Sequence, residues 1–150
     1  MKLLLPLLCS LFFLTLSACS NDDDGLELLP ECGPNIVILE EDLSPPGDRF
    51  SLIDFRVEEL CATIVVEATG CAISGWKAEL RTNGLILESL PTQTMAYLRL
   101  DDGVDDDAFV CQAQQRATFT FDLSPYLEGA LPTRLRFVDQ INVDTTILIE

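Results

Sequence analysis

Six cysteines and the absence of histidine limit the chemistry that this 150-residue sequence can perform. Without histidine, neither a Ser-His-Asp nor a Cys-His arrangement is available to activate a nucleophile. The chemistry expected of the thiols is acylation and disulfide formation. Nucleophilic catalysis is therefore not expected.

Cys19 ends the segment Leu16-Ser17-Ala18-Cys19, which resembles the bacterial lipobox. Lys2 and an apolar stretch precede it in the layout of a secretory signal peptide. The stretch is shorter than the roughly 20 residues of a membrane-spanning helix. In a lipobox the thiol is acylated and the chain is cut just before the cysteine. We therefore expect a signal peptide at residues 1–18 and a lipid anchor at Cys19.

An acidic run follows Cys19 directly. It consists of Ser20, Asn21, Asp22, Asp23 and Asp24. Such a run resembles the export signal that sends lipoproteins of Bacteroidota to the outer face of the outer membrane, although a solvated spacer has the same composition. We expect a surface-exposed protein held in the outer membrane by its N-terminal lipid. More than one acyl chain would make the attachment lasting, because a single chain anchors only marginally.

Four cysteines remain once Cys9 leaves with the signal peptide and Cys19 takes the lipid. These are Cys32, Cys61, Cys71 and Cys111. An even number in an exported chain predicts two disulfides. We favour Cys32–Cys61 with Cys71–Cys111, and the main alternative is Cys32–Cys111 with Cys61–Cys71. Zinc is the other use of four cysteines, but the sequence has no Cys-x-x-Cys pair.

Residues 101–109, DDGVDDDAF, form the candidate metal site. Carboxylate oxygens suit Ca²⁺, which takes about six to eight of them. The candidate ligands are Asp101, Asp105 and Asp107, with Asp102 and Asp106 beside them. The spacing is not that of an EF-hand, and a solvated, self-repelling loop has the same composition. Apart from this candidate calcium ion, we expect no cofactor.

The chain is strongly acidic, with a formal net charge of −16, which argues against binding to nucleic acid or to anionic lipid head groups. Basic residues nevertheless fall on outward positions of the expected strands: Lys77, Arg81, Arg99, Arg116, Arg134 and Arg136. Such a stripe suits an acidic partner or a glycan. Ordinary salt bridges, worth about 0–1 kcal/mol each, would explain it equally. Trp76 and Tyr97 could stack on sugars, but Trp76 lies on an inward position and is expected in the core.

A period of two in hydrophobicity runs through the chain after about residue 34 and predicts β-strands. Ile53, Phe55 and Val57 share one inward face. Further inward faces comprise Trp76, Ala78 and Leu80; Phe119, Phe121 and Leu123; and Leu135 with Phe137. Strands are expected at 35–39, within 50–60, and at 60–70, 76–82, 85–90, 97–100, 117–123, 133–138 and 145–149. No stretch after the signal peptide shows a convincing helical period.

Asn83-Gly84 predicts a type I′ hairpin turn, because both residues accept a positive φ. This turn sets Leu80 opposite Leu87. It makes residues 85–90 the partner strand. Tyr126 is expected to cap a sheet corner with its hydroxyl bonded to the backbone.

These short strands predict an all-β fold, a two-sheet antiparallel sandwich of the Ig-like or jelly-roll kind with about eight or nine strands and two disulfides. The expected domain covers residues 35–150. Residues 19–34 would form the lipidated N-terminus and an acidic tether.

Three stretches resemble landmarks of small surface lipoproteins of Bacteroidota whose function is unknown. They are TGCAISGW at 69–76, LDDGVDDDAFVCQA at 100–113 and FDLSPYL at 121–127. The resemblance covers roughly residues 50–150. It favours the Cys71–Cys111 disulfide, since both cysteines lie in the shared stretches. It implies no activity.

The leading hypothesis is a non-enzymatic surface lipoprotein that binds a glycan or another outer-membrane protein through its sandwich, whose rigid sheets would hold binding loops. The alternative is a structural accessory subunit of an envelope complex, which an exposed apolar patch would favour. A small carboxylate-dependent hydrolase is the third hypothesis. It requires two carboxyl groups about 5–10 Å apart in a cleft.

Overall fold

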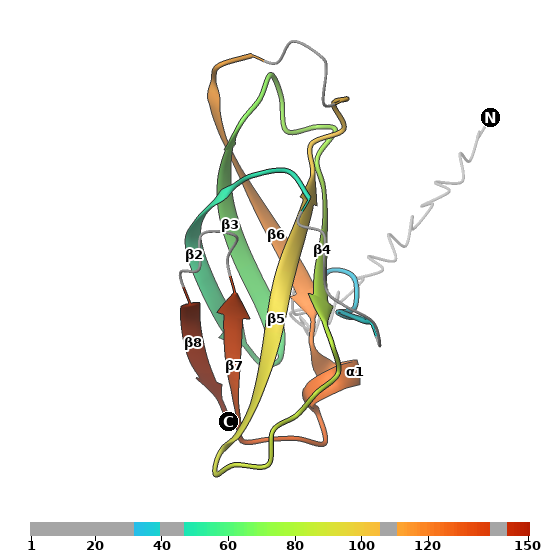
Figure 1. Ribbon diagram of the computed structural model, residues 1–150, viewed down its shortest axis with the longest axis vertical. Helices are drawn as coiled ribbons and strands as arrows, with labels where there is room; N and C mark the ends of the chain where they lie inside the picture. The colour runs from blue at the N-terminus through green and yellow to red at the C-terminus, as the bar shows by residue number, and fades with distance from the viewer. Residues whose placement is uncertain (1–31, 40–46, 106–110, 139–143) are drawn as a thin grey trace, which may run out of the picture. The chain divides into compact units, whose positions relative to one another are not determined.

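Two β-sheets packed face to face form the folded part of the chain (Figure 1). A computed structural model describes residues 32–39, 47–105, 111–138 and 144–150. The larger sheet has the strand order β1-β4-β5-β7-β8, and the smaller has the order β2-β3-β6. The elements are β1 (Val37–Ile38), β2 (Ser51–Glu58), β3 (Cys61–Thr69), β4 (Lys77–Thr82), β5 (Thr92–Asp101), β6 (Gln114–Asp122), the short helix α1 (Ser124–Leu127), β7 (Thr133–Val138) and β8 (Asp144–Ile149). The predicted two-sheet sandwich is confirmed.

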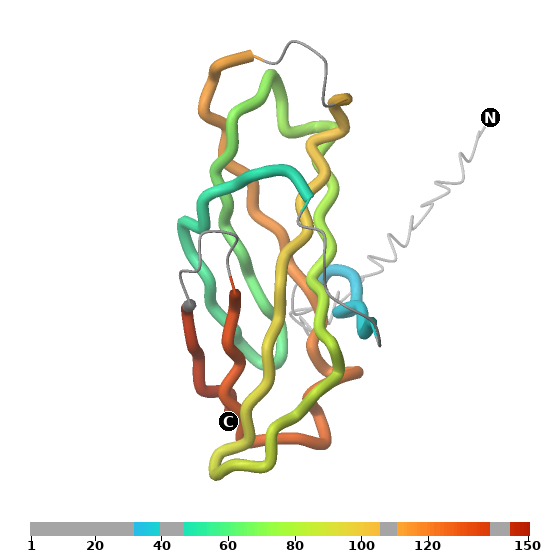
Figure 2. Tube along the Cα trace, in the orientation of Figure 1, coloured from blue at the N-terminus to red at the C-terminus, as the bar shows by residue number. Residues whose placement is uncertain are grey.

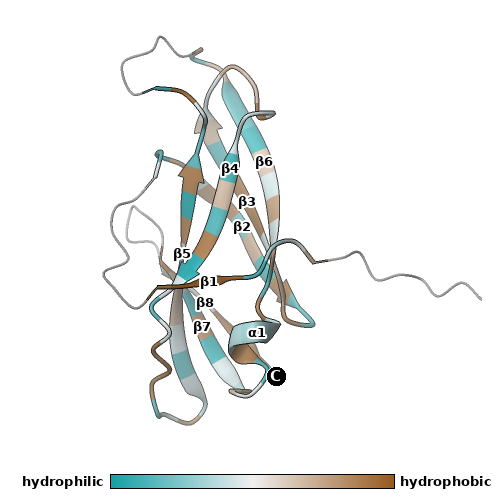
Figure 3. Cartoon of the chain, turned by 90° about the vertical axis from the view of Figure 1, so that its right-hand side faces the viewer, coloured by the Kyte–Doolittle hydropathy of each residue, from teal (hydrophilic) through white to brown (hydrophobic). Residues whose placement is uncertain are grey.

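The alternation along each strand places the core between the two sheets. On β3, Ala62, Ile64, Val66 and Ala68 are buried, and the residues between them lie on the other face. Figure 3 shows the same alternation of hydrophilic and hydrophobic residues along the strands. Phe55 of β2 meets Phe137 of β7 with ring centroids 5.0 Å apart, so these rings join the two layers. Burying a side chain of this size contributes roughly 1.5–3 kcal/mol.

Two strand pairs are parallel, in addition to the antiparallel pairing that the sequence predicted. They are β1 with β4 and β5 with β7. The chain leaves β5, runs back along β6 in the opposite sheet, and passes through α1 before it enters β7. Because β6 reverses the direction, β7 returns beside β5 pointing the same way.

A β-bulge in β2 corrects the prediction that Ile53 faces inward. The register against β3 shifts between Leu52 and Asp54, so Ile53 is left over and is 43% exposed. Leu52 packs against the core instead. The inward prediction holds for Phe55, which is buried, and for Val57, which packs against the core. A bulge of this kind inserts one residue, and every side chain before it changes face.

The hairpin predicted at Asn83-Gly84 is wrong. Leu80 pairs with Leu98 of β5 and not with Leu87, and residues 85–90 form no strand. The Asn83 side-chain oxygen instead accepts a hydrogen bond from the Leu85 backbone N–H at 3.1 Å, and only Gly84 of the two has a positive φ (74°). The side chain of Asn83 thus makes a local turn, and residues 83–91 form a wide connection between β4 and β5.

The tight two-residue turn of the molecule occurs elsewhere, between β2 and β3. Glu58 pairs with Cys61, and the intervening Glu59 and Leu60 have φ values of 48° and 64°. Positive φ at both central positions is the signature of a type I′ turn, which usually takes Asn-Gly. For residues with a Cβ the left-handed conformation costs roughly 1–2 kcal/mol each.

The segment 32–39 closes one lateral edge of the sandwich (Figure 2). Asn35 bridges to Asp122 of β6, and β1 then pairs with β4 of the other sheet. Cys32 is bonded to Cys61 of β3. At Gly33 a Cβ would lie 2.0 Å from the carbonyl oxygen of Thr120, so this close approach requires glycine. Residues 32–34 therefore belong to the folded domain, three residues earlier than the predicted boundary.

The second disulfide joins Cys71, just after β3, to Cys111, just before β6, with the Cα atoms 4.8 Å apart. The Gly70 N–H donates to the Ala113 carbonyl at 2.9 Å beside it. The two bonds are the pairing that the sequence analysis favoured over its alternative.

Candidate functional site

Basic side chains gather on the outer face of the five-stranded sheet. We call Lys77, Arg81, Arg99, Arg134 and Arg136 the cationic face; they are five of the nine Lys and Arg residues of the chain. The strand registers place them one after another along β5 and its two neighbours. Arg134 pairs with Gln93, Arg136 with Met95, Arg81 with Tyr97, Arg99 with Glu79 and Lys77 with Asp101, so two carboxylates lie among the cations. Directly paired residues have Cβ atoms about 5 Å apart. The sheet thus brings five cations together on a protein whose overall charge is −16.

Arg116 does not belong to this face, which corrects the single stripe expected from the sequence. It lies on β6 in the other sheet and binds Glu67 of β3, with Nη2 and Oε2 3.0 Å apart. Arg56 on the same sheet binds Asp54 at 2.8 Å. Arg56 and Arg116, both on the smaller sheet, are therefore neutralised by neighbouring carboxylates at the surface. On the cationic face, Arg81 also binds a carboxylate: it donates to Glu79 through Nε at 2.9 Å and through Nη2.

Tyr97 lies within the cationic face. It pairs with Arg81 on one side and with Val138 on the other, and its ring is partly exposed. Trp76, in contrast, is buried in the core, as the sequence predicted. Tyr97 is thus the aromatic residue placed to stack on a ligand at this face.

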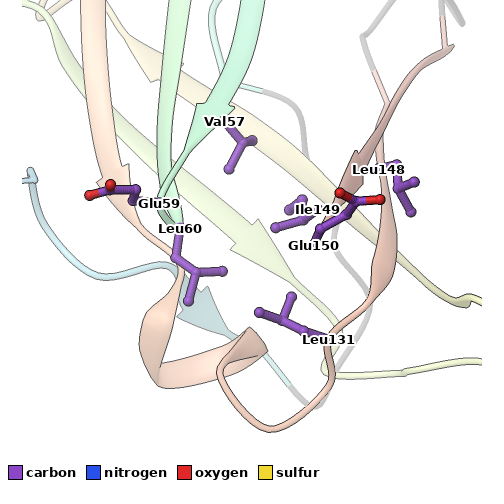
Figure 4. A pocket seen from close by; sticks show the side chains of 7 residues that line it. All are labelled: Val57, Glu59, Leu60, Leu131, Leu148, Ile149 and Glu150. Carbon is purple, nitrogen blue, oxygen red and sulfur yellow. The ribbon is translucent and has the colours of Figure 1, made fainter.

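A second feature is a pocket of about 530 Å³ where the end of β2, the β2–β3 turn and the end of β8 meet. Figure 4 shows the side chains of Val57, Leu60, Leu131 and Ile149 pointing toward one another. Glu59 and Glu150 lie at its rim, and the side chain of Leu148 points away from the group. We call this the edge pocket. Its residues come from three distant segments and share no local pattern, so no signal in the sequence indicates it.

The candidate calcium ligands are only partly described. The Asp101 Oδ1 accepts a hydrogen bond from Gly103 N at 2.9 Å, and the Asp102 Oδ1 accepts one from Val104 N at 2.8 Å. Asp105 is exposed, and Asp106 and Asp107 lie outside the described residues. Within the described ranges, no three acidic, histidine or cysteine side chains are grouped so that they could hold a metal ion. Calcium binding by this loop stays a prediction.

Asp122, at the end of β6, has a pKa below its usual value. The Ser124 hydroxyl and the Ser124 backbone N–H both donate to its Oδ1, the latter at 2.8 Å, and these bonds stabilise the carboxylate. A general acid needs the opposite shift. The role of Asp122 is structural: it fixes the chain where it enters α1.

Tyr126 of α1 ties the connection 83–91 to the sheet. Its hydroxyl lies 2.5 Å from the Thr94 Oγ1 and donates to the Leu85 carbonyl at 3.3 Å. Thr94 donates to the same carbonyl at 2.9 Å. The predicted bond from this hydroxyl to the backbone is present. The connection that it holds exposes three leucines, with exposed fractions of 63% for Leu85, 57% for Leu87 and 98% for Leu90.

The residues of the expected lipid anchor and export signal lie outside the described residues. These are Cys19, Ser20, Asn21, Asp22, Asp23 and Asp24. Among the residues that are described, no helix is long and apolar enough to cross a membrane.

The fold and the two surface features define the class: a small, disulfide-linked β-sandwich with a charged sheet face and an apolar edge pocket. A protein of unknown function, DUF1344, from Bacteroides vulgatus has a similar structure, with a TM-score of 0.50 and 9% sequence identity over 78% of this chain. This chain spans 55% of that protein. A NigD-like immunity protein from Bacteroides caccae aligns with a TM-score of 0.45 and 10% identity, over 77% of this chain and 59% of the other.

No protein-family model matches the chain, and no curated protein sequence matches it. At about 10% identity the structural likeness concerns the fold alone. The similarity to the Bacteroides vulgatus protein thus shows a shared fold and nothing about activity.

Proposed function

We propose that the chain is a non-enzymatic lipoprotein of the outer-membrane surface whose cationic face binds an anionic glycan. The lipobox-like segment ending at Cys19 and the acidic run after it support the location. The observation that carries the binding function is the concentration of Lys77, Arg81, Arg99, Arg134 and Arg136 on one sheet face of an acidic protein. An acidic patch on another outer-membrane protein is the second type of partner that this face would suit.

The chemistry of the face fits a polymer of acidic sugars. Arginine forks bind carboxylates through two parallel hydrogen bonds, and a flat sheet presents several of them to a chain of repeating charges. Tyr97, between Arg81 and Val138, offers a ring on which a sugar can stack. The attraction among exposed groups is screened within about 10 Å at 0.1 M salt, so binding should weaken steeply as salt is added.

A titration with polygalacturonate, with dextran as the neutral control, tests the proposal. The double variant Lys77→Glu with Arg134→Glu should weaken binding by about tenfold or more, since each reversal replaces an attraction by a repulsion. The matched control is Arg56→Glu with Arg116→Glu, which changes the net charge equally on the other sheet. Equal losses in both variants would attribute binding to net charge and refute the cationic face as the site. A Lys77→Glu, Arg134→Glu variant that unfolds more easily but binds as before would show that these cations serve only internal ion pairs.

A second candidate function is that of an accessory subunit in an envelope complex. The exposed leucines of the connection 83–91 favour it, because soluble domains rarely hold several large apolar side chains in water on an ordered segment. Replacing Leu85, Leu87 and Leu90 by serine should then abolish co-purification with detergent-solubilised membrane complexes. Unchanged co-purification would exclude these leucines as the contact.

A further inference from the structure

The two lateral edges of the sandwich differ. Segment 32–39 covers one of them by pairing with β6 through Asn35 and with β4 through β1. At the other edge, β8 ends the larger sheet and β2 ends the smaller. In the part of the chain that the structure describes, each of these two strands is paired on one side only. The outer edge of β8 thus presents backbone N–H and C=O groups in the way that invites another strand.

Within the described residues, β8 lacks the proline, lysine and bulge that often prevent strand addition. Its sequence, Asp-Thr-Thr-Ile-Leu-Ile, contains no proline, lysine or glycine, and its pairing with β7 is regular. β2 differs, because it has a bulge at Ile53 and the exposed charges of Asp54 and Arg56. β1 differs because it has two residues only. Leu148, at 48% exposure, adds an apolar side chain to the unprotected edge.

The edge pocket lies beside the end of β8. Ile149 contributes to its lining from β8 and Leu131 from the segment just before β7 in the same sheet, and Val57 and Leu60 contribute from the opposite sheet and its turn. A strand added to β8 would place its inward side chains in line with Ile147 and Ile149. An apolar side chain there would enter the pocket, whose volume of about 530 Å³ exceeds that of any single side chain.

The turn that forms one wall of the pocket is conformationally costly. Glu59 and Leu60 both have positive φ, although Asn-Gly would make the same turn without the penalty. Leu60 packs against the core and lines the pocket, while Glu59 is exposed at the rim. Core packing of the Leu60 side chain offsets the cost of its positive φ. The Glu59 side chain is exposed and gains nothing from core packing. Strain retained at such a position points to a role for the side chain.

The charges select the occupant. Glu59 and Glu150 lie at the rim, and Glu58 is 82% exposed next to them. A second copy of the chain is a poor occupant, because it carries the same acidic residues at its own edge. Two molecules of net charge −16 also repel each other. A basic segment is complementary to this rim.

We propose that β8 and the edge pocket bind an extended segment of a partner protein, which adds to β8 as a strand, places an apolar side chain in the pocket and sets a lysine or arginine against Glu59 and Glu150. This mode is β-strand addition, in which main-chain hydrogen bonds supply affinity and side-chain pockets supply specificity. It concerns a surface other than the cationic face and does not depend on the glycan proposal.

The test is an NMR titration of the full chain with an end-blocked peptide of about seven residues, alternating valine and threonine, with a lysine at each end. Chemical shifts should change for residues 144–150 and 57–60, and for Arg134 and Arg136 as the cross-strand neighbours of Leu148 and Thr146, but not for Lys77, Arg81 and Arg99 on the far strands. A peptide with a central proline should bind at least about tenfold more weakly, because proline removes a main-chain donor. A peptide with glutamate in place of both lysines should also lose about tenfold.

Variants of the protein complete the test. Leu148→Lys, which places a charge on the edge strand, should weaken binding about tenfold or more. Ile73→Lys is the matched control, because it also introduces a lysine at an apolar side chain of similar exposure, 45%, near Cys71. This variant should bind the peptide as the parent chain does. If Leu148→Lys fails to fold, the peptide series on the parent chain still decides.

Four results would overturn the proposal: no binding at millimolar peptide, equal binding of the proline peptide, equal binding of the glutamate peptide, or shifts confined to Lys77, Arg81 and Arg99. Dimerisation of the chain through β8 would also overturn it, since a second copy would then be the occupant. Success of this titration and failure of the polygalacturonate titration, or the reverse, are separate outcomes because the probes need different groups: the peptide needs the backbone edge of β8, and the polymer needs the cations of the outer face.

Discussion

Replacing Gly33 by alanine should destabilise the domain strongly, through one methyl group. A Cβ at this position would lie 2.0 Å from the Thr120 carbonyl oxygen, and real Cβ atoms essentially never lie closer than 3.0 Å to such a neighbouring atom. The segment would have to move by about 1 Å or more. It cannot move alone, because Cys32 is bonded to Cys61 of the central strand β3.

The cost follows from the contacts that such a movement breaks. Asp122 N donates to the Pro34 carbonyl at 3.0 Å, and Ile36 N donates to the Asp122 carbonyl at 2.9 Å. Each backbone hydrogen bond contributes about 1 kcal/mol, and strain at the cross-linked residue adds to the loss. We expect the free energy of unfolding to fall by about 2–4 kcal/mol, which lowers Tm by roughly 10 °C for a domain of this size.

Thermal unfolding followed by circular dichroism, with both disulfides oxidised, measures this change. Gly129→Ala is the control, since a Cβ there meets nothing within 4 Å. It should change Tm by no more than about 2 °C. If Gly33→Ala unfolds within the same range as Gly129→Ala, segment 32–39 does not close the sandwich in the way described, and the asymmetry of the two edges is refuted.

Three further changes test other contacts. Tyr126→Phe removes the hydroxyl that meets Thr94 and the Leu85 carbonyl, and should lower the free energy of unfolding by about 1–2 kcal/mol in urea titrations; a value near zero would mean that the corner bond is not formed. Glu59→Asn should stabilise the domain by roughly 0.5–1 kcal/mol, because asparagine tolerates positive φ better, and a destabilised variant would contradict the strain described at this turn. The lowered pKa of Asp122 stabilises the folded state at pH values above its ordinary value of 3.8, and this stability is lost as the pH falls through the folded pKa. Asp122→Asn should therefore show a stability deficit at about pH 6 that shrinks in acid, and a deficit independent of pH would exclude the carboxylate as its cause.

The sandwich could be predicted from residues that are buried and exposed in turn along a strand. Leu135 and Phe137 are buried and Arg134 and Arg136 exposed, as the period of two requires, and β7 has the bounds predicted for it. Such a pattern survives in the sequence because each strand buries one face only.

The turns were harder to predict, because side chains override the local preference. Asn83-Gly84 has the composition of a hairpin turn, yet Asn83 bonds to its own backbone, and Leu80 finds its partner in β5. Glu59 and Leu60 make the tight turn although nothing in their composition indicates it. There the neighbouring pair of Glu58 with Cys61 and the packing of Leu60 decide the conformation.

The candidate sites were predictable in part. The basic residues were recognised as outward-facing, but the strand order decides that five of them share one sheet and that Arg116 lies on the other. No spacing rule in the sequence gives that order. The edge pocket depends on β2, β8 and the residue Leu131 meeting at one edge, which is a long-range property of the fold.

The disulfide at Cys32 has a mechanical consequence. Any pull on the chain that precedes this residue passes through the sulfur bridge into Cys61, in the middle strand of the smaller sheet. The stretch between Cys32 and Cys61, which includes β1 and β2, is bypassed in this way, and the second bridge spans the stretch between Cys71 and Cys111 in the same manner. If the proposed lipid anchor holds the chain, drag on the domain would load the disulfide and the central strand of the smaller sheet, and would leave β1 and β2 unstretched.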